Sequence, residues 1–342
     1  MIQNNFHIIT ADVITKILLD HVNDLCDIIK NTYIAHANGY TVNPTSFFLR
    51  FPDDETTRII ALPAVLNREQ KIAGIKWIGS NPKNIQYGIE RASATIILND
   101  YETKYPLACL EGSVISKMRT SASAVIAAEY LSKEKSKNLG IVGCGPISSG
   151  ILDILKIRSF EFEKIYIFDK DAKRAYSFMD YHCNGTEIVI AKSYEELIRN
   201  SDLIIFSTSS ISPYIHNIEF FDHKPLVLHI SLRDLGCTII ENSDNFVDDI
   251  EHVLNANTSL DLVFRKLANK DFINGTLADV INNKVQVNYS KTRIFSPMGL
   301  GVLDLALAYF VFDIAVTTRS TITIKNFFKS STIDNFKMIN DR

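Results

Sequence analysis

The sequence of 342 residues predicts an α/β protein with a doubly wound parallel sheet and a second, α+β domain. Two observations predict this class. In the middle third, short apolar runs alternate with segments of helical period, as in parallel sheets whose strands are joined by helices. Residues 1–120 instead carry a long helical stretch followed by closely spaced strand runs with a hairpin turn. The length is also typical of two domains.

Six apolar runs in the middle third are predicted strands. They are Leu139–Gly143, Lys164–Asp169, Glu187–Ala191, Asp202–Ser207, Leu226–Ser231 and Asn245–Asp248. Segments of helical period, such as Tyr194–Asn200, separate several of them. Ligands of such sheets bind at the carboxyl ends of the strands. Polar segments follow two of the runs there, at Ser207–Ser210 and Ser231–Asp234.

The other elements belong to the first domain or lead into and out of it. An amphipathic helix is predicted from Ala11 to about Ala37, and Ser113–Leu131 has helical spacing with many small residues. Strands are predicted at Arg58–Pro63, Ile72–Ile78, Ala92–Asn99 and Pro106–Glu111, with a turn at Asn99–Glu102. Lys291–Phe312 contains the loop Ser296–Gly299 and an apolar helix that we expect to return to the first domain. We therefore expect one domain over 1–120 and 300–342 and another over 121–299.

Composition restricts the class of protein and its partners. Hydrophobic residues make up 46%, charged residues 22%, and the net charge is −3, so no nucleic-acid partner is expected. No apolar run approaches the ~18 residues of a membrane helix, and no secretory signal is evident. The five cysteines are dispersed without metal-ligand spacing, which predicts reduced thiols in a cytoplasmic protein and no metal site. The eight histidines form no cluster, and His229, inside an apolar strand, is expected in the core.

A glycine turn follows the first strand of the middle third. It reads Gly143, Cys144, Gly145, Pro146, Ile147 and Ser148 and opens a helical segment. Gly143 permits a tight turn, and Gly145 lets the backbone approach a pyrophosphate. The N-terminus of the helix offers free N–H groups and a partial positive charge. Ser148 replaces the usual third glycine, which predicts slightly looser packing of helix on strand.

An acid closes the next predicted strand. Asp169 lies 21 positions after Ser148, close to the roughly 20 expected for a carboxylate that accepts from a ribose 2′-hydroxyl. Together with the turn and its flanking strands, it predicts a Rossmann-type dinucleotide site, rather than a glycine turn of some other α/β protein. A carboxylate repels a 2′-phosphate, so it favours NAD over NADP, although Lys170 and Lys173 are near.

Basic residues stand in apolar strand contexts of the first domain. Lys76 lies in the apolar run Gly74–Ile78. A buried lysine without a partner costs several kcal/mol or loses its proton, so we expect it to be paired or functional, with a snorkelling side chain as the alternative. Arginine suits planar recognition of carboxylates. Each arginine alone is more often a surface ion pair, but several in one domain predict a substrate with more than one carboxylate. These arginines are Arg50, Arg58, Arg91 and Arg119.

One carboxylate follows a strand of the predicted parallel sheet. Asp234 lies just past the run Leu226–Ser231, where a ligand is expected. A carboxylate at this place can move protons beside a nicotinamide. The alternative is a helix cap or a turn former.

Several segments resemble one enzyme family. They are GIKWIGSNPKN (Gly74–Asn84), the ILND hairpin, SKMRTSASAV (Ser116–Val125), GCGPIS and SPMGLGVLDLA. The chain resembles the ornithine cyclodeaminase/mu-crystallin family over about residues 45–315. Through segments such as ERAS (Glu90–Ser93) it is most similar to a subgroup of dehydrogenases that supply 2,3-diaminopropionate for siderophores or antibiotics.

The resemblance implies a reaction and a role for each matching residue. Family members oxidise a C–N bond next to a carboxylate with NAD, and water or an internal amine attacks the imine. The resemblance implies that Arg50 and Arg119 bind substrate carboxylates, that Lys76 takes or holds the proton of the reacting amine, and that Asp234 is the acid/base. It also implies that Thr120 and the loop Gly143–Ser148 hold the pyrophosphate and Asp169 the ribose, with Ser207, Thr208, Ser231, Met298 and Gly299 on the nicotinamide side.

The subgroup implies a specific substrate and partners. Its substrate joins glutamate to a diaminopropionate unit, carries three carboxylates, and is converted to 2-oxoglutarate and L-2,3-diaminopropionate. Arg58 and Arg91 are then candidates for the extra carboxylates. We expect a cytoplasmic homodimer, supplied by a PLP-dependent synthase.

Two other functions are weighed. Ornithine cyclodeaminase, alanine dehydrogenase or ketimine reductase would be another enzyme of the family, against which Arg91 argues. A crystallin-like protein that binds NAD(P)H without catalysis is of another class, and Lys76, Arg119 and Asp234 argue against it.

Overall fold

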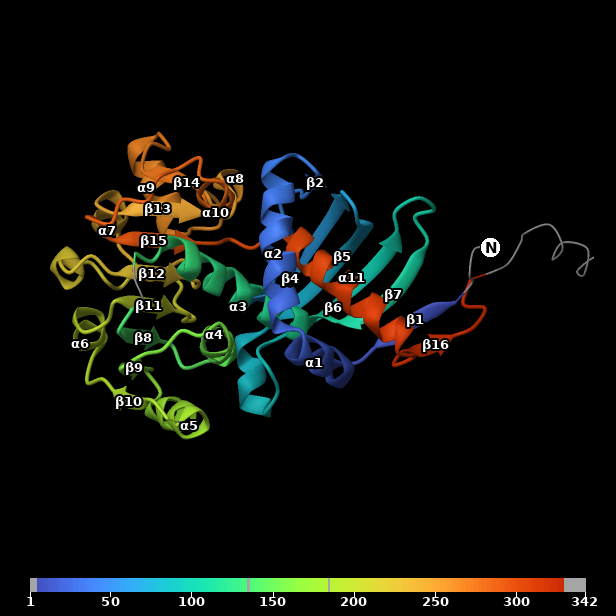
Figure 1. Ribbon diagram of the computed structural model, residues 1–342, viewed down its shortest axis with the longest axis horizontal. Coiled ribbons are helices and arrows are strands. Elements are labelled where there is room, and N and C mark those ends of the chain that lie inside the picture. Colours follow the sequence, from blue (N-terminus) through green and yellow to red (C-terminus); the bar gives the residue numbers. More distant parts are fainter. Residues whose placement is uncertain (1–4, 134–135, 184, 329–342) are drawn as a thin grey trace, which may run out of the picture. The chain divides into compact units, whose positions relative to one another are not determined.

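The chain folds into two compact units. The computed structural model describes residues 5–133, 136–183 and 185–328. Unit 1 takes its described residues from Met1–His21, Tyr40–Ser116 and Asp304–Arg342, and unit 2 from Val22–Gly39 and Lys117–Leu303. The chain passes between the units four times, and two of these junctions fall inside the long helices α3 (Gly112–Leu131) and α11 (Gly301–Thr317) (Figure 1). Each unit is described by itself.

Unit 2 is built on a parallel sheet of eight strands. Their order is β10-β9-β8-β11-β12-β15-β13-β14, and every pairing is parallel. The strands are β8 (Asn138–Val142), β9 (Lys164–Phe168), β10 (Glu187–Ile190), β11 (Leu203–Phe206), β12 (Leu226–His229), β13 (Asp244–Val247), β14 (Ile273–Thr276) and β15 (Arg293–Ser296). The chain runs outward from β8 in one direction and then returns to β11 on its other side. This confirms the predicted doubly wound sheet, in which the six expected runs are β8 to β13.

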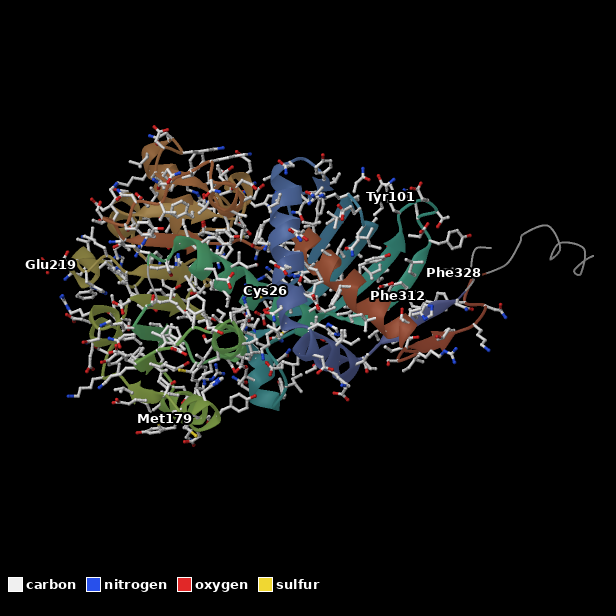
Figure 2. All side chains as sticks on the ribbon, viewed as in Figure 1. Cys26, Tyr101, Met179, Glu219, Phe312 and Phe328 are labelled. Carbon is white, nitrogen blue, oxygen red and sulfur yellow. The ribbon has the colours of Figure 1, made fainter. Side chains whose placement is uncertain are left out.

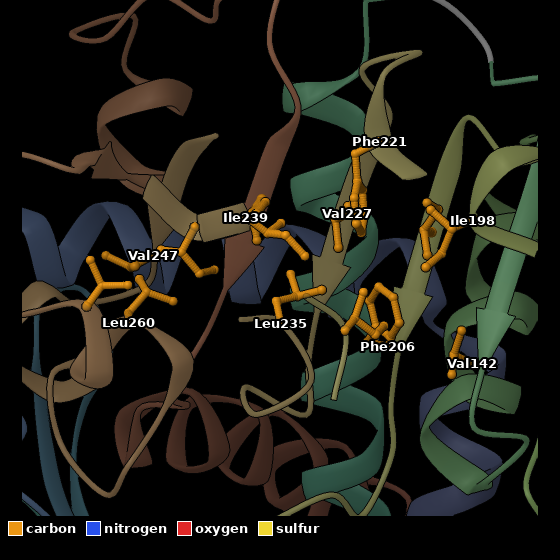
Figure 3. Close-up of a cluster of buried hydrophobic side chains, with 14 of the residues drawn as sticks. Val142, Ile198, Phe206, Phe221, Val227, Leu235, Ile239, Val247 and Leu260 are labelled. Atoms are coloured by element: carbon orange, nitrogen blue, oxygen red, sulfur yellow. The ribbon is translucent and has the colours of Figure 1, made fainter. Parts of the chain in front are cut away.

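Helices connect most of these strands. They are α4 (Pro146–Ile157), α5 (Ala172–His182), α6 (Tyr194–Arg199), α7 (Cys237–Glu241), α8 (Ile250–Val253), α9 (Ser259–Leu267) and α10 (Leu277–Ile281), with a 3-10 turn η2 (Ile218–Phe221). Helix α2 (Val22–Ala37) precedes all of these strands in the sequence and also belongs to unit 2. Strands β11 and β12 are buried along their whole length, because helices cover both faces of such a sheet. Phe206, Val227 and Phe221 belong to the resulting apolar core (Figure 3).

Two predictions about elements are wrong. The sequence predicted only a loop and a helix in Lys291–Phe312, but β15 lies there, between β12 and β13. It has four residues and opens with Arg293, so its apolar run is too short to recognise. The single helix predicted over Ala11–Ala37 is two helices, α1 (Ala11–Asp20) and α2, broken at His21. The hydroxyl of Tyr33 in α2 donates to Ser123 Oγ at 3.0 Å, so this segment belongs to unit 2 rather than to the first predicted domain.

Unit 1 is built on a mostly antiparallel sheet. The order is β16-β1-β7-β6-β5-β4-β2, with β3 paired to β4. The strands are β1 (Phe6–Ile9), β2 (Thr41–Val42), β3 (Phe47–Phe51), β4 (Asp54–Asn67), β5 (Lys71–Ser80), β6 (Ala92–Asp100), β7 (Pro106–Glu111) and β16 (Ile322–Ile324), with a 3-10 turn η1 (Pro82–Tyr87) after β5. The four strands predicted here are β4 to β7. At the edge of the sheet, Phe6 stacks on Phe327 with ring centroids 4.7 Å apart, and Tyr105 meets Phe328 edge-on. Phe328 is labelled in Figure 2.

The two faces of the unit 1 sheet differ. Alternate residues of each strand point to opposite faces. One face, which includes Lys76, Ile96 and Leu110, is buried, and Leu305 of α11 packs close to Gly74 on that side. The other face carries large exposed apolar side chains: Phe47 (67% exposed), Leu49 (51%), Trp77 (44%) and Ile97 (38%). Among the described residues, no helix is both long and apolar enough to span a membrane.

Candidate active site

The glycine turn of unit 2 has the geometry expected of a pyrophosphate loop. Gly143 adopts φ +94°, and a Cβ there would lie 2.5 Å from the carbonyl oxygen of Ser207. Any larger residue would therefore clash with the chain that leaves β11. Gly145 caps α4, and no atom lies within 4 Å of the position a Cβ would take. The open backbone and the helix N-terminus together fit an anionic pyrophosphate.

Ser148 closes the turn rather than loosening it. It is fully buried, and its Oγ donates to the carbonyl oxygen of Gly143 at 2.5 Å. Helix α4 packs closely against α3 two residues further on, at Gly150. A Cβ on Gly150 would lie 2.6 Å from Ser121 Oγ of α3. The looser packing of this helix on the strand, expected from the missing third glycine, stays a prediction. Thr120, predicted at the pyrophosphate, immediately precedes Ser121 on α3.

Asp169 lies against the glycine turn. Its Oδ2 accepts from the backbone N–H of Cys144 at 2.8 Å, and its Oδ1 accepts from Asp171 N at 2.9 Å. The carboxylate therefore stands at the end of β9 beside the loop, where a ribose hydroxyl would need an acceptor. Burial and the neighbouring Asp169 carboxylate raise the pKa of the Cys144 thiol to about 12, so this thiol is protonated and unreactive at neutral pH.

Asp234 is the centre of a buried polar cluster after β12. It is fully buried, and its carboxylate accepts from Thr208 Oγ1 at 2.5 Å and from Ser231 Oγ. Two residues predicted on the nicotinamide side, Thr208 and Ser231, thus bind this acid. The predicted alternative of a helix cap is wrong, because Gly236 caps the following helix α7.

The cluster keeps Asp234 ionised. Burial alone would raise the pKa of its carboxyl, but hydrogen bonds and charge from His229, with hydrogen bonds from Ser231 and Thr208, hold it below its usual value. Burial and the nearby Asp234 charge raise the pKa of the Tyr214 phenol. Lys170, one of the two lysines near Asp169 in the sequence, lies over the Tyr214 ring, with its Nζ 5.7 Å from the centroid.

A second carboxylate, missed in the sequence, holds the loop after β15. The backbone N–H groups of Met298 and Gly299 donate to Asp248 at 2.9 and 2.6 Å. Asp248 is buried at the end of β13, and burial raises its pKa. Gly299 adopts φ +93°, and a Cβ there would lie 2.8 Å from Nη1 of Arg119. The structure therefore brings Arg119 of α3 against the predicted nicotinamide loop.

Lys76 of unit 1 is buried and paired. Only 2% of it is exposed, and its Nζ donates to Asp304 Oδ2 at 2.7 Å and to Ser116 Oγ at 3.2 Å. The alternative of a snorkelling lysine is wrong. Asp304 lies in the first turn of α11 and is itself fully buried, so this pair joins β5 to a helix more than 200 residues away in sequence.

Three of the predicted arginines gather at one end of the unit 1 sheet. Arg50 of β3 stands directly opposite Arg58 of β4, which stands opposite Ser80 of β5. Residues opposite one another in antiparallel strands share a face. Arg91 joins them by donating from Nη1 to Ser80 Oγ at 3.1 Å. Ser80 is four residues beyond Lys76 on the same strand, so the lysine lies on the same face, roughly 13 Å along it.

Comparison with known proteins identifies the family. Residues 7–319 match the model of the ornithine cyclodeaminase/mu-crystallin family. The chain belongs to this family. The resemblance predicted from the sequence is thereby confirmed.

Members of the ornithine cyclodeaminase/mu-crystallin family with related sequences and folds are known. The chain is 31% identical over 305 residues to the Staphylococcus aureus N-((2S)-2-amino-2-carboxyethyl)-L-glutamate dehydrogenase, covering 86% of this chain and 90% of that protein. An archaeal alanine dehydrogenase dimer with bound NAD has a TM-score of 0.85 at 25% identity, covering 95% of this chain and all of that one. The Thermococcus litoralis Δ1-pyrroline-2-carboxylate reductase, in complex with NADH and L-proline, has a TM-score of 0.84 at 22% identity, covering 91% and 98%.

Proposed function

We propose that this protein is an NAD-dependent dehydrogenase that oxidises N-(2-amino-2-carboxyethyl)-L-glutamate and hydrolyses the imine to 2-oxoglutarate and L-2,3-diaminopropionate. The observation that carries the proposal is the cluster of Arg50, Arg58 and Arg91 on the face that also bears Lys76. A substrate with three carboxylates needs several cations, and arginine binds carboxylates through two parallel hydrogen bonds. The 31% identity to the Staphylococcus aureus enzyme supports the same assignment.

The dinucleotide residues of unit 2 fit NAD. When bound, NAD supplies the hydride acceptor. The Gly143–Ser148 loop and the N-terminus of α4 bind the pyrophosphate, with Thr120 contributing from α3. Asp169 accepts from the ribose 2′-hydroxyl and repels a 2′-phosphate, which sets the preference for NAD over NADP. Ser207, Met298 and Gly299 lie on the nicotinamide side.

The basic residues bind the substrate and set its protonation. Arg50 and Arg119 hold carboxylates next to the reacting centre, while Arg58 and Arg91 hold the additional ones. Lys76 takes or holds the proton of the reacting nitrogen, because hydride departure requires the nitrogen lone pair. Asp304 fixes the Lys76 ammonium by their 2.7 Å ion pair.

Asp234 serves the hydrolytic half of the reaction. Loss of hydride from the glutamate α-carbon leaves a protonated ketimine. Water forms a bond to that carbon, and Asp234 accepts the proton that the water loses. The proton then passes to the nitrogen, and the C–N bond breaks with its electrons on nitrogen. The products are 2-oxoglutarate and the ammonium form of L-2,3-diaminopropionate.

We assign the exposed apolar face of the unit 1 sheet to a second copy of the chain. Phe47, Leu49, Trp77 and Ile97 share this face, and exposed apolar side chains that gather on one face are typical of interaction sites. The archaeal alanine dehydrogenase is described as a dimer.

A cytoplasmic location agrees with five cysteines that form no disulfide. The substrate would come from a PLP-dependent synthase encoded nearby.

A substrate panel tests the proposal. The purified protein is mixed with NAD and the tricarboxylate amine, L-ornithine or L-alanine, and NADH absorbance and products are followed. We expect NADH, 2-oxoglutarate and diaminopropionate from the first alone. Proline from ornithine, or pyruvate from alanine, would instead assign another activity of the family. NADH binding without turnover of any of them would indicate a crystallin-like binding protein.

A further inference from the structure

His229 of β12 is a buried titratable group that the proposed reaction does not yet use. It is fully buried, as the sequence predicted for a core histidine. Its Nε2 lies 3.2 Å from Asp234 Oδ2 and also accepts the backbone N–H of Asp234 at 3.1 Å. On the other side of the ring, Nδ1 lies 3.3 Å from Ser296 Oγ of β15. Both ring nitrogens therefore have polar partners inside the core.

A neutral His229 ring has too few protons to make a hydrogen bond at each of its polar contacts. A neutral imidazole carries a single N–H. With Nε2 accepting from the Asp234 backbone, that N–H is on Nδ1 and donates to Ser296. The lone pair of Nε2 then faces the ionised Oδ2 at 3.2 Å, which is unfavourable for two acceptors. One further proton turns this contact into a hydrogen bond: a charge-assisted one if the proton is on Nε2, and a neutral O–H···N bond if it is on Oδ2.

The groups around the His229 ring indicate that this proton is shared between His229 and Asp234. The groups that face the ring are the Asp234 carboxylate, the Ser296 hydroxyl and the edge of Phe206, whose ring centroid is 6.2 Å away. Tyr214 and Arg233 lie within reach of the Asp234 charge, and the Arg233 guanidinium donates to the carbonyl oxygen of Ala256. Thr208 and Ser231 donate to the same carboxylate and fix its orientation.

We propose that His229 is the positioning residue and proton partner of Asp234, so that the two form one acid–base pair during imine hydrolysis. The inference rests on the proposed function. As water bonds to the imine carbon, its O–H bond breaks and the pair takes the proton, while the C=N π electrons move to nitrogen. The pair returns the proton to nitrogen, and the C–N bond breaks with its electrons on nitrogen. The hydroxyl proton leaves with the released ammonium, so the pair ends with the proton count it began with.

The test separates oxidation from hydrolysis in His229→Gln, whose amide can donate to Asp234 but cannot titrate. We expect the single-turnover rate of NADH formation to stay within about threefold of the parent, while 2-oxoglutarate release slows at least tenfold. The plot of kcat against pH should also lose the limb that depends on protonation of the His229–Asp234 pair. In the double variant with Asp234→Asn, the loss should not exceed that of Asp234→Asn alone. Equal slowing of both steps at every pH, or additive losses, would overturn the pairing.

A matched control and a second measurement complete the test. His182→Gln changes another buried histidine of unit 2, bound to Ser149, and should leave the pH profile unchanged. Nitrogen NMR of ring-labelled protein does not depend on substrate. We expect the chemical shift of His229 Nε2 to differ between the parent and Asp234→Asn, because the substitution removes the anionic oxygen 3.2 Å from that nitrogen. If the His229 nitrogen shifts are the same in both proteins, the pairing is wrong, whatever the substrate proves to be.

Discussion

Lys76 and Asp304 meet in a buried ion pair, with 2.7 Å between Nζ and Oδ2, although 228 positions separate them in the sequence. The pair places a cation on the face of the unit 1 sheet that also carries Arg50 and Arg58. Removal of one partner from such a pair leaves an uncompensated buried charge, which costs about 3–5 kcal/mol of folding free energy. The ion pair therefore has consequences for both stability and turnover.

Replacement of Lys76 tests both consequences. Lys76→Ala should abolish turnover while NADH affinity stays within several-fold, because the dinucleotide residues belong to unit 2. The variant should also unfold at lower denaturant concentration, as followed by circular dichroism. Asp304→Asn is the matched control, since it removes the ion pair but keeps Lys76. If Lys76→Ala retains turnover, the role assigned to the lysine is wrong.

Replacement of Arg91 tests the binding of an additional carboxylate. Arg91→Gln should raise the KM for the tricarboxylate amine roughly tenfold, about 1.4 kcal/mol, and leave the KM for NAD unchanged. Arg91→Lys should restore only part of the affinity, because lysine lacks the planar pair of donors. Arg68→Gln, an exposed arginine in the turn between β4 and β5, is the control. An unchanged substrate KM in Arg91→Gln would remove this residue from the site.

Acid titration of stability tests the contact between Asp249 and His36 in unit 2. The hydrogen bond from His36, at 3.1 Å, lowers the pKa of Asp249 to about 2, from an ordinary value of 3.8. A depressed pKa adds stability that is present above pH 3.8 and lost as the pH falls toward 2. We expect Asp249→Asn to be less stable than the parent by about 1 kcal/mol at pH 6, allowing for solvent screening. The difference should vanish near pH 2, and a constant difference across this range would contradict the assignment.

Light scattering tests the apolar sheet face. Trp77→Glu places a charge in the exposed row that includes Phe47, and it should convert the proposed dimer to a monomer at micromolar concentration. Tyr176→Glu is the control, because Tyr176 is 57% exposed on α5 of unit 2. A dimer that survives Trp77→Glu would place the second copy on another surface.

What the sequence could predict follows from the range of each interaction. The parallel strands were recognisable because strands buried on both faces form continuous apolar runs, and Asp169 was recognisable by its spacing from the glycine turn. Asp304 and Asp248 could not be recognised in this way, because the partner of each is distant in the sequence. Asp304 binds Lys76, and Asp248 binds the backbone amides of Met298 and Gly299. The break at His21 was hidden because the apolar period continues across it.

Isotope transfer tests the central claim most directly. The tricarboxylate amine is prepared with deuterium on the glutamate α-carbon and converted by the enzyme in the presence of NAD. The account predicts one deuterated NADH and one diaminopropionate for each 2-oxoglutarate formed, as measured by mass spectrometry. Consumption of the amine without net NADH, or NADH without deuterium, would contradict it.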